Sequence, residues 1–463
     1  MRPLKVGAKE NDTVLVAKFE DNIYSIGNYC SHFGAPLHTG AIVGDRVFCP
    51  WHSASFNLKS GAIEGGPALD GVPQYNIISK NGKSFVQVPE VLTQTKSQQL
   101  AKRDLNDQRH FIVIGGGPAG LNCAEALRQS GFTGQISLVS ADSVAPYDRT
   151  SLSKAVATGD VSQMKLRSEE YLQNDAQINL ILGTRAERII AKDNLVQLSN
   201  NQTLRYDKLC LAVGTSAVLP KIKGINLKNV HALRDHYHQA AIRDQAAKSK
   251  NIVILGGGFI GSECASALKL QFGDKVNVHL VHGDRVPMER QFGFEVGKVI
   301  LQDHKQAGVQ LHMQKLVTEI GGTGDSVQHV ILNDGTKLEA DLVIVGAGVT
   351  PSTQFLKDSG IQLNESGALV CNNKLQTNID DIFAAGDAVS YQTGDNSHIR
   401  IEHYITSQDQ GSNAAFNMLG QSQVFNRVPF FWTRNYNKSI QYVGYAQSYD
   451  EVFIQGDPLM QQL

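Results

Sequence analysis

The sequence predicts a multidomain protein in which a small all-β domain precedes a larger α/β part. The first 90 residues contain short runs typical of β-strands and two pairs of cysteine and histidine. The remainder contains, twice, an apolar strand followed by a glycine-rich turn and the start of a helix. A chain of 463 residues is long enough for two to four domains.

Composition excludes several classes of protein. The chain has 43 Lys and Arg against 44 Asp and Glu, a net charge of -1, so we expect no nucleic-acid partner. No run approaches the roughly 18 consecutive apolar residues of a membrane span, and the N-terminus is too polar for a secretory signal. The six cysteines are too sparse for a disulfide framework. We therefore expect a soluble cytoplasmic or mitochondrial protein with no visible targeting segment.

The N-terminal part carries a candidate metal site in two loops, Cys30-x-His32 and Cys49-Pro-Trp-His52. Two thiolates and two imidazoles at this spacing suit either zinc or an iron-sulfur cluster. Proline and small residues beside the ligands turn backbone N–H groups inward, where they can bond cluster sulfur, and this favours iron-sulfur. Short runs typical of strands frame the loops, at 13–19, 23–26 and 46–48.

The two loops resemble those of the Rieske fold, in which a Cys pair binds one iron of a [2Fe-2S] cluster and a His pair binds the other. The resemblance implies that Cys30 and Cys49 hold one iron. His32 and His52 then hold the other. High-potential Rieske proteins add a disulfide and Ser and Tyr donors at positions that here are Ala35, Trp51, Ala54 and Phe56. With fewer donors, we expect a potential near the low end of the roughly -150 to +300 mV Rieske range.

The first glycine-rich motif follows the apolar run 111–114. Gly115 permits a tight turn, Gly117 lets a pyrophosphate approach the backbone, and Gly120 lets the helix pack closely on the strand. Two copies of the motif imply two dinucleotide sites. The second copy follows the run 251–255 and contains Gly256, Gly258 and Gly261.

Two later segments indicate which nucleotide each motif binds. The runs ending at Gly214 and at Gly386-Asp387 resemble the second and third fingerprints of two-dinucleotide flavoproteins. The resemblance implies that the first motif binds FAD, that Asp387 binds the ribityl chain, and that the second motif binds NAD(P)H. Gly214 and Gly346 are assigned to the nucleotide sites.

The segment 146–154, Pro-Tyr-Asp-Arg-Thr-Ser-Leu-Ser-Lys, resembles one in oxygenase-coupled ferredoxin reductases and in the apoptosis-inducing-factor family. The resemblance implies that Lys154 lies by flavin N5 and pairs with Glu263, and these two are the candidate catalytic residues. It also places Arg149 in the cofactor site. A cation beside the flavin would stabilise the anionic reduced ring and raise its potential. The alternative for Lys154 is a solvated surface charge.

Two further segments match the same family. The resemblance implies that Glu402, in Arg-Ile-Glu-His, contacts the nicotinamide, and that Trp432, in Pro-Phe-Phe-Trp, lies against the flavin. Ordinary packing is the alternative for each. No Cys-x4-Cys pair follows Tyr147, which excludes dithiol chemistry.

The acids that usually bind ribose are missing from both nucleotide units. The strand of the first unit ends in Ser140, which together with Asp142 is the candidate substitute. The strand of the second unit ends in His282, which with Arg285 could bind a 2'-phosphate. We nevertheless favour NADH.

The order of these modules resembles the Rieske-containing apoptosis-inducing-factor-like flavoproteins, which are similar to ferredoxin reductases. The family continues past a predicted strand at 452–457 with a further α+β domain, so we expect the C-terminal domain to be truncated and the N-terminus to be incomplete. The predicted boundaries are a Rieske domain at 1–90, a linker at 91–108, an FAD-binding domain at 109–219 and 343–424, an NAD(P)-binding domain at 220–342, and the start of the C-terminal domain at 425–463.

The resemblance implies an NAD(P)H-dependent oxidoreductase that passes electrons through FAD to its own cluster and on to an unknown acceptor. Alternatives are a redox-sensing or cell-death signalling flavoprotein and a zinc-bearing interaction domain on a flavoenzyme; a homodimer is left open. An oxygenase would need a 2-His-1-carboxylate iron site. The segment Asp235-His236-Tyr-His238 has those residue types, but we interpret it as part of a connecting helix.

Overall fold

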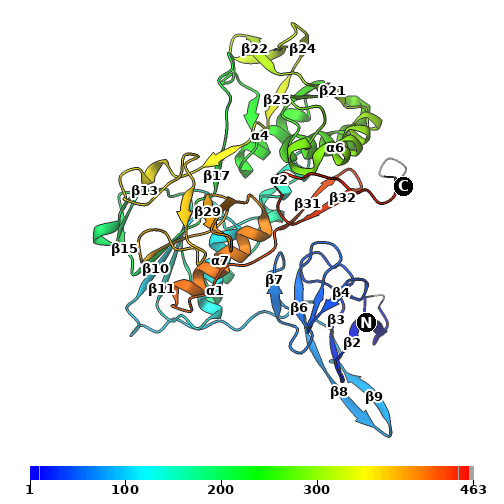
Figure 1. The fold of residues 1–463 in the computed structure, drawn as a ribbon, viewed down its shortest axis with the longest axis vertical. Coiled ribbons are helices and arrows are strands. Elements are labelled where there is room, and N and C mark those ends of the chain that lie inside the picture. The colour runs from blue at the N-terminus through cyan, green and yellow to red at the C-terminus, as the bar shows by residue number, and fades with distance from the viewer. Residues whose placement is uncertain (10, 447, 458–463) are drawn as a thin grey trace.

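The N-terminal β domain consists of two antiparallel sheets in the computed structural model, which describes residues 1–457 apart from 10 and 447 (Figure 1). Alternating apolar residues such as Leu15, Val47 and Phe56 point between the sheets and form its core. The first sheet contains, in spatial order, β1 (Arg2–Lys5), β2 (Thr13–Phe19), β3 (Asn22–Gly27), β8 (Gln74–Lys80) and β9 (Lys83–Gln87). The second contains β4 (Ala41–Val43), β5 (Arg46–Phe48), β6 (Ser55–Asn57) and β7 (Ile63–Gly65).

The first α/β unit is built on a five-stranded parallel sheet whose strands are apolar on both faces, as burial on both faces requires. Its order is β12 (Asn179–Ile181), β11 (Gln135–Val139), β10 (His110–Ile114), β16 (Lys208–Leu211) and β28 (Ile382–Ala384). Helix α1 (Pro118–Gln129) packs closely on α7 (Tyr404–Met418), because Gly411 lets the backbone of α7 approach the carbonyl of Ala119. Smaller sheets flank this unit: β13 (Ala186–Ile190), β14 (Leu195–Leu198) and β15 (Thr203–Arg205), and β27 (Leu369–Cys371), β29 (Val389–Gln392) and β30 (His398–Arg400).

The second α/β unit repeats the plan with a second five-stranded parallel sheet. Its order is β18 (Val230–Ala232), β25 (Leu342–Val345), β19 (Asn251–Leu255), β20 (Asn277–His282) and β21 (Gln310–Met313). Its helices are α4 (His236–Ala246), α5 (Phe259–Phe272) and α6 (Glu289–Gln306). A side sheet of β22 (Val317–Thr323), β23 (Ser326–Leu332) and β24 (Lys337–Glu339) is attached, and β17 (Thr215–Ala217) pairs with β26 (Val349–Pro351) where the chain passes between the units.

The C-terminal hairpin of β31 (Phe430–Asn435) and β32 (Lys438–Val443) lies between the α/β part and the β domain (Figure 1). Strand β31 contacts α5 on one side, and Gln441 of β32 donates to the carbonyl of Trp51 on the other. Two short helices, α2 (Ser151–Lys154) and α3 (Val161–Met164), lie between β11 and β12. Single turns of other helix types occur at Leu37–Thr39, Tyr171–Asp175, Ala191–Asp193, Gly273–Lys275 and Gln354–Leu356.

The strands predicted before the two glycine motifs and around the cysteine loops are confirmed, but the predicted strand at 452–457 is wrong. That segment makes no ladder, and most of its side chains are exposed, so its apolar residues have no sheet to join. No helix or strand lies between β9 and β10, where the linker was predicted. The last part of the predicted C-terminal domain, 458–463, lies outside the described residues.

Candidate functional site

The predicted cluster ligands lie at the tips of two loops of the β domain. Cys30 and His32 follow β3, and Cys49 and His52 follow β5. Both thiols are buried and hydrogen-bonded to each other. The two imidazoles face one another, with their Nδ1 atoms 3.1 Å apart. The fold therefore brings the Cys pair together and the His pair together, as two ligands on each of two irons require.

The chemistry of these four side chains fits a cluster. The backbone N–H groups of His32 and His52 donate to the sulfur atoms of Cys30 and Cys49, respectively. The thiol of Cys30 and the N–H donors lower the pKa of Cys49 to about 7, which makes a thiolate ligand accessible near neutral pH. Burial lowers the pKa of His32 and of His52 to about 4, so both imidazoles are neutral, the form that binds metal.

A cavity of about 750 Å³ opens at the first glycine motif, at the carboxyl ends of β10, β11 and β16. Its size and position are those expected for a dinucleotide. Gly117 has open space where a Cβ would stand, and a Cβ at Gly120 would lie 1.8 Å from the Gly115 carbonyl oxygen. The predicted residues that line the cavity are Gly115, Gly117, Ser140, Arg149, Lys154, Gly214, Glu263, Asp387, Glu402 and Trp432.

The ion pair of Lys154 and Glu263 stands in the wall of this cavity. Lys154 Nζ lies 2.9 Å from Glu263 Oε1, and only 5% of the Glu263 side chain is exposed. The carboxylate also accepts from the hydroxyl of Ser153 and from Thr433 Oγ1, the latter at 2.7 Å. Because two elements, α2 with Ser153 and Lys154 and β31 with Thr433, bind the carboxylate, the ammonium group is held at one place in the wall.

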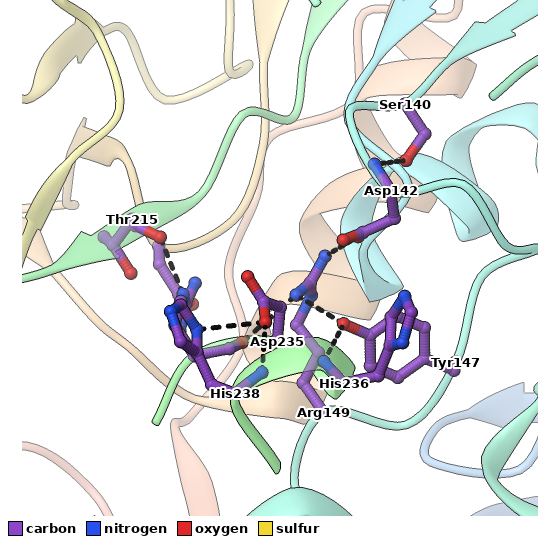
Figure 2. Close-up of polar contacts among 10 residues, drawn as sticks. Ser140, Asp142, Tyr147, Arg149, Thr215, Asp235, His236 and His238 are labelled. Atoms are coloured by element: carbon purple, nitrogen blue, oxygen red, sulfur yellow. Dashed lines mark hydrogen bonds and ion pairs between the residues drawn. The ribbon is translucent and has the colours of Figure 1, made fainter. Parts of the chain in front are cut away.

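Arg149 is the centre of a polar network in the same wall (Figure 2). Its guanidinium donates to the hydroxyl of Tyr147 at 3.0 Å and to the carbonyl of Arg234 at 3.2 Å, and it forms an ion pair with Asp142. The N–H of Asp142 in turn donates to Ser140 Oγ at 3.2 Å. Asp142 is thus bound by Arg149, and Ser140 directly follows β11 beside the glycine turn.

Asp387 and Glu402 are held by basic partners. Asp387 accepts from Ser407 Oγ at 3.0 Å, and Arg234 Nη2 lies 3.8 Å from its second oxygen. Glu402 Oε1 lies 2.5 Å from Arg400 Nη1. Burial raises the pKa of the Glu402 carboxyl group. Both carboxylates face the cavity and are available to hydroxyl or amide groups of a ligand.

The second glycine motif repeats the backbone geometry of the first. A Cβ at Gly261 would lie 1.8 Å from the Gly256 carbonyl oxygen, the same approach as at the first motif, and Gly258 is open. Gly346, at the end of β25, packs its carbonyl against Gly256. The N–H of Gly257 donates to His282 Nδ1 at 3.1 Å, so this imidazole lies directly over the turn.

Arg285, which the sequence offered as a phosphate ligand, is already paired. Its Nε donates to Glu289 Oε1 at 2.8 Å, and its backbone N–H donates to Glu289 Oε2 at 3.0 Å. Asp284 lies 3.4 Å from His282 Nε2 and 3.0 Å from Arg290 Nε. Acidic and basic side chains therefore balance around this rim.

Trp432 connects the two sites. It lines the cavity, and its ring stacks on the imidazole of His52 with the ring centroids 4.2 Å apart and the planes at 33°. The ring of His32 lies 6.4 Å away, edge on. The sequence placed Trp432 at the flavin, but the contact with a cluster ligand was not predicted, because no local pattern shows that the hairpin meets the β domain.

The interpretation of 235–238 as part of a connecting helix is confirmed. Asp235 is the N-cap of α4, where its Oδ1 accepts from the N–H of His238 at 2.9 Å. Figure 2 shows the ring of His236 beside that of Tyr147, away from the Asp235 carboxylate. Asp235 thus caps the helix and also lines the cavity.

Sequence reasoning missed three residues of the site. Ser153 and Thr433 hold Glu263 in place, and Arg234 holds Asp387. Ser153 and Thr433 each adjoin a residue that the sequence did single out, which is the one signal that could have found them. Arg234 adjoins Asp235, which the sequence considered only as a possible iron ligand, and its pairing with Asp387 depends on the packing of the two units.

Two family models match the chain. The Rieske [2Fe-2S] domain matches residues 2–76, and the pyridine nucleotide-disulphide oxidoreductase family matches residues 109–411. Apoptosis-inducing factor 3 of Homo sapiens is 33% identical over 461 residues, covering 96% of this chain and 74% of the relative. The biphenyl dioxygenase system ferredoxin–NAD(+) reductase component of Paraburkholderia xenovorans is 31% identical over 350 residues, covering 75% and 84%.

Solved structures agree with this class. The ferredoxin reductase for the CYP199A2 system from Rhodopseudomonas palustris superposes with a TM-score of 0.72 at 28% identity, covering 76% of this chain and 86% of that one. The reductase in the covalent putidaredoxin reductase–putidaredoxin complex gives the same TM-score and identity, covering 77% and 86%. The fold and site thus define a Rieske-bearing flavoprotein oxidoreductase. The chain belongs to the pyridine nucleotide-disulphide oxidoreductase family, in the Rieske-containing group to which apoptosis-inducing factor 3 belongs.

The cofactors follow from this membership. The Rieske domain implies a [2Fe-2S] cluster rather than zinc, and the reductase family implies FAD and NAD(P)H. The cavity at the first glycine motif and the four ligands in the β domain have the donor sets that FAD and the cluster need. Across the described residues, no helix has both the length and the hydropathy to cross a membrane.

Proposed function

We propose that this protein takes electrons from NADH into FAD at the first glycine motif and passes them singly to its own Rieske cluster, which reduces a separate acceptor. The observation that supports the proposal is Trp432, which lines the cavity and stacks on His52. The indole ring thus contacts a cluster ligand on one side and lines the flavin cavity on the other.

When bound, nicotinamide would supply a hydride, FAD would take up its two electrons and release them one at a time, and the cluster would carry a single electron at a time. The residues of the chain set the conditions for these steps. We propose that the ammonium group of Lys154, fixed by Glu263, stabilises the anionic reduced flavin. We propose that the carboxylate of Glu402, held by Arg400, accepts a hydrogen bond from the carboxamide of nicotinamide.

The rim of the second glycine motif supports NADH as the nucleotide. Arg285 is held by two bonds to Glu289, and Asp284 holds Arg290, so neither guanidinium is left unpaired for a 2'-phosphate. A phosphate there would meet two carboxylates. Ribose hydroxyls, which donate hydrogen bonds, suit the same carboxylates.

Rapid mixing of the anaerobic holoprotein with NADH tests the function. We expect flavin bleaching first, then loss of the absorbance of the oxidised cluster in the same protein molecule at a rate independent of protein concentration. Flavin bleaching with no change at the cluster would contradict internal transfer and favour the redox-sensing alternative. An equal flavin reduction rate and affinity with NADPH would contradict the nucleotide preference alone.

A further inference from the structure

The β domain is attached to the α/β part by one connection without helix or strand, yet its contacts with that part are specific (Figure 1). Three sets of polar contacts cross the interface. Among the described residues, one joins Arg167 to Asp70, one joins α7 and Arg427 to the segment 64–67, and one joins Gln441 to the loop of His52. A flexible tether alone would hold the domains at an effective concentration of roughly millimolar, without fixing their orientation.

Arg167 makes the strongest of these contacts. Its Nη1 lies 2.7 Å from Asp70 Oδ2, its Nη2 lies 3.0 Å from Asp70 Oδ1, and Nη2 also donates to the Leu69 carbonyl at 3.2 Å. Its Nε donates to Glu125 Oε1 at 2.8 Å. Separate N–H groups of the planar guanidinium thereby bind Asp70 on the β domain and Glu125 on the FAD-binding unit.

This ion triad is largely shielded from solvent, with Glu125 buried and its two partners partly exposed. The exposed side-chain fractions are 12% for Arg167, 17% for Asp70 and 3% for Glu125. Removing one partner of a buried charge group leaves another charge without compensation, which costs far more than a surface pair is worth. Among the interdomain contacts of the described residues, the triad is therefore the one whose loss should affect docking most.

The location of Glu125 connects the triad to the helix that borders the cavity. Glu125 belongs to α1, the helix whose first turn, at Pro118 and Ala119, lines the cavity. Through Arg167, the β domain is fixed to the same rigid element that positions the nucleotide phosphates. Two contacts therefore orient the β domain relative to the flavin site. One is the contact of His52 with Trp432, and the other is the bond of Arg167 to Asp70.

We propose that Arg167 is a positioning residue for electron transfer: bridging Asp70 and Glu125, it docks the Rieske domain so that His52 stays stacked on Trp432. This inference rests on the proposed function. The transfer is one electron from reduced flavin to oxidised cluster, and its rate falls steeply as the donor and acceptor separate. No group on Arg167 itself is oxidised or reduced.

The experiment compares three variants of the holoprotein with a matched control. Asp70→Asn and Arg167→Ala remove the interdomain pair, and Arg167→Lys keeps the charge without the bidentate geometry. Asp381→Asn is the control, because it breaks an ion pair with Lys208 that lies wholly within the FAD-binding unit. Each protein is mixed with NADH anaerobically, and its radius of gyration is measured by small-angle X-ray scattering.

For Asp70→Asn and Arg167→Ala we expect flavin bleaching at the parental rate, cluster reduction slower by about tenfold or more, and a larger radius of gyration. Arg167→Lys should be intermediate, and Asp381→Asn should match the parent in all three. Asp70→Asn lies on the β domain and leaves the pair of Arg167 with Glu125, so it remains informative if Arg167→Ala fails to fold.

Parental cluster reduction and parental size in Asp70→Asn and Arg167→Lys would overturn the inference. Slow flavin bleaching in either would also overturn it, because the triad would then act on the reductase and not on docking. If the cluster of the parent protein is not reduced at all, the proposed function fails, and an increased radius of gyration in Asp70→Asn would still support docking by the triad.

Discussion

The two glycine motifs share a backbone and differ in their surroundings. At Gly120 and at Gly261 the helix approaches the preceding turn equally closely. Beside the first turn, the neighbouring strand is followed by the small Ser140, and the turn opens into a cavity of about 750 Å³. At the second turn, the imidazole of His282 takes the corresponding place and lies over the backbone. The glycine motif therefore provides the backbone of a phosphate site. The residues packed around each motif make the two sites different.

The largest effect is expected from substitutions at the feature that the two motifs share, the close approach of the helix to the glycine turn. Gly120→Ala places a Cβ 1.8 Å from a backbone oxygen and should yield protein without bound FAD. Gly261→Ala places a Cβ at the same distance in the second unit and should keep FAD but lose bleaching by NADH. Absorbance spectra before and after NADH measure both. The reverse pattern would mean that the two nucleotide assignments are exchanged.

The next effect concerns a feature of the first site, the Lys154 ammonium group that the buried carboxylate of Glu263 holds in the cavity wall. Lys154→Met should lower the rate of flavin reduction by NADH by about 100-fold, since a fixed charge near the reacting centre contributes strongly in a site of low dielectric. It should also make the flavin potential more negative. Lys208→Met, which removes a similarly exposed lysine of the same unit that does not line the cavity, is the control. An unchanged potential in Lys154→Met would contradict the proposed role.

The helices that follow the two motifs are also covered differently, α1 by α7 and α5 by β31. Helix α7 carries Asp409, whose carboxyl group accepts from the N–H of Gly66 and faces Arg427; burial raises its pKa to about 6. The folded protein then binds this proton more tightly than the unfolded chain does, so the contribution to stability falls as pH rises from about 4 to about 6.

Asp409→Asn should remove that decline and stabilise the protein above pH 6 by about 1 to 2 kcal/mol. The midpoint of thermal unfolding, measured against pH for parent and variant, checks the prediction. The two curves should converge toward pH 4. A constant difference across the whole range would show that the carboxyl group does not titrate in this window.

The smallest effect sharpens the difference in nucleotide choice. Glu289→Gln releases Arg285 from its ion pair and should improve binding of NADPH relative to NADH by about fivefold, roughly 1 kcal/mol. Equilibrium titration of both nucleotides against the oxidised enzyme gives the ratio. Arg243→Gln, which disturbs an ion pair elsewhere in the second unit, should leave the ratio unchanged. No gain for Glu289→Gln would mean that Arg285 does not reach the ribose.

The parts of this molecule that depend on local pattern could be predicted from its sequence. The predicted runs 13–19, 46–48 and 251–255 coincide with β2, β5 and β19, because alternation or continuous apolar character sets a strand locally. The pairing of Lys154 with Glu263 was implied by family resemblance and is seen in the structure. The functional assignments of these site residues remain predictions.

What could not be predicted depends on contacts between distant segments. The stacking of Trp432 on His52 and the bond between Arg167 and Asp70 each join residues that no periodicity or motif relates. The pairing of Arg285 with Glu289 joins residues four apart in the sequence. It could not be predicted from helical spacing, because α6 begins only at Glu289 and Arg285 lies before the helix. The segment 452–457 has the apolar residues of a strand but no neighbouring strand to pair with.

The most direct test of internal electron transfer uses the only two tryptophans in the sequence. Trp432 stacks on His52 from the side of the cavity, and Trp51 flanks the same imidazole at 6.5 Å but is 47% exposed. In rapid mixing with NADH, Trp432→Leu should bleach its flavin but reduce its cluster much more slowly than Trp51→Leu, which should resemble the parent. Equal rates of cluster reduction in the two variants would contradict a path through Trp432.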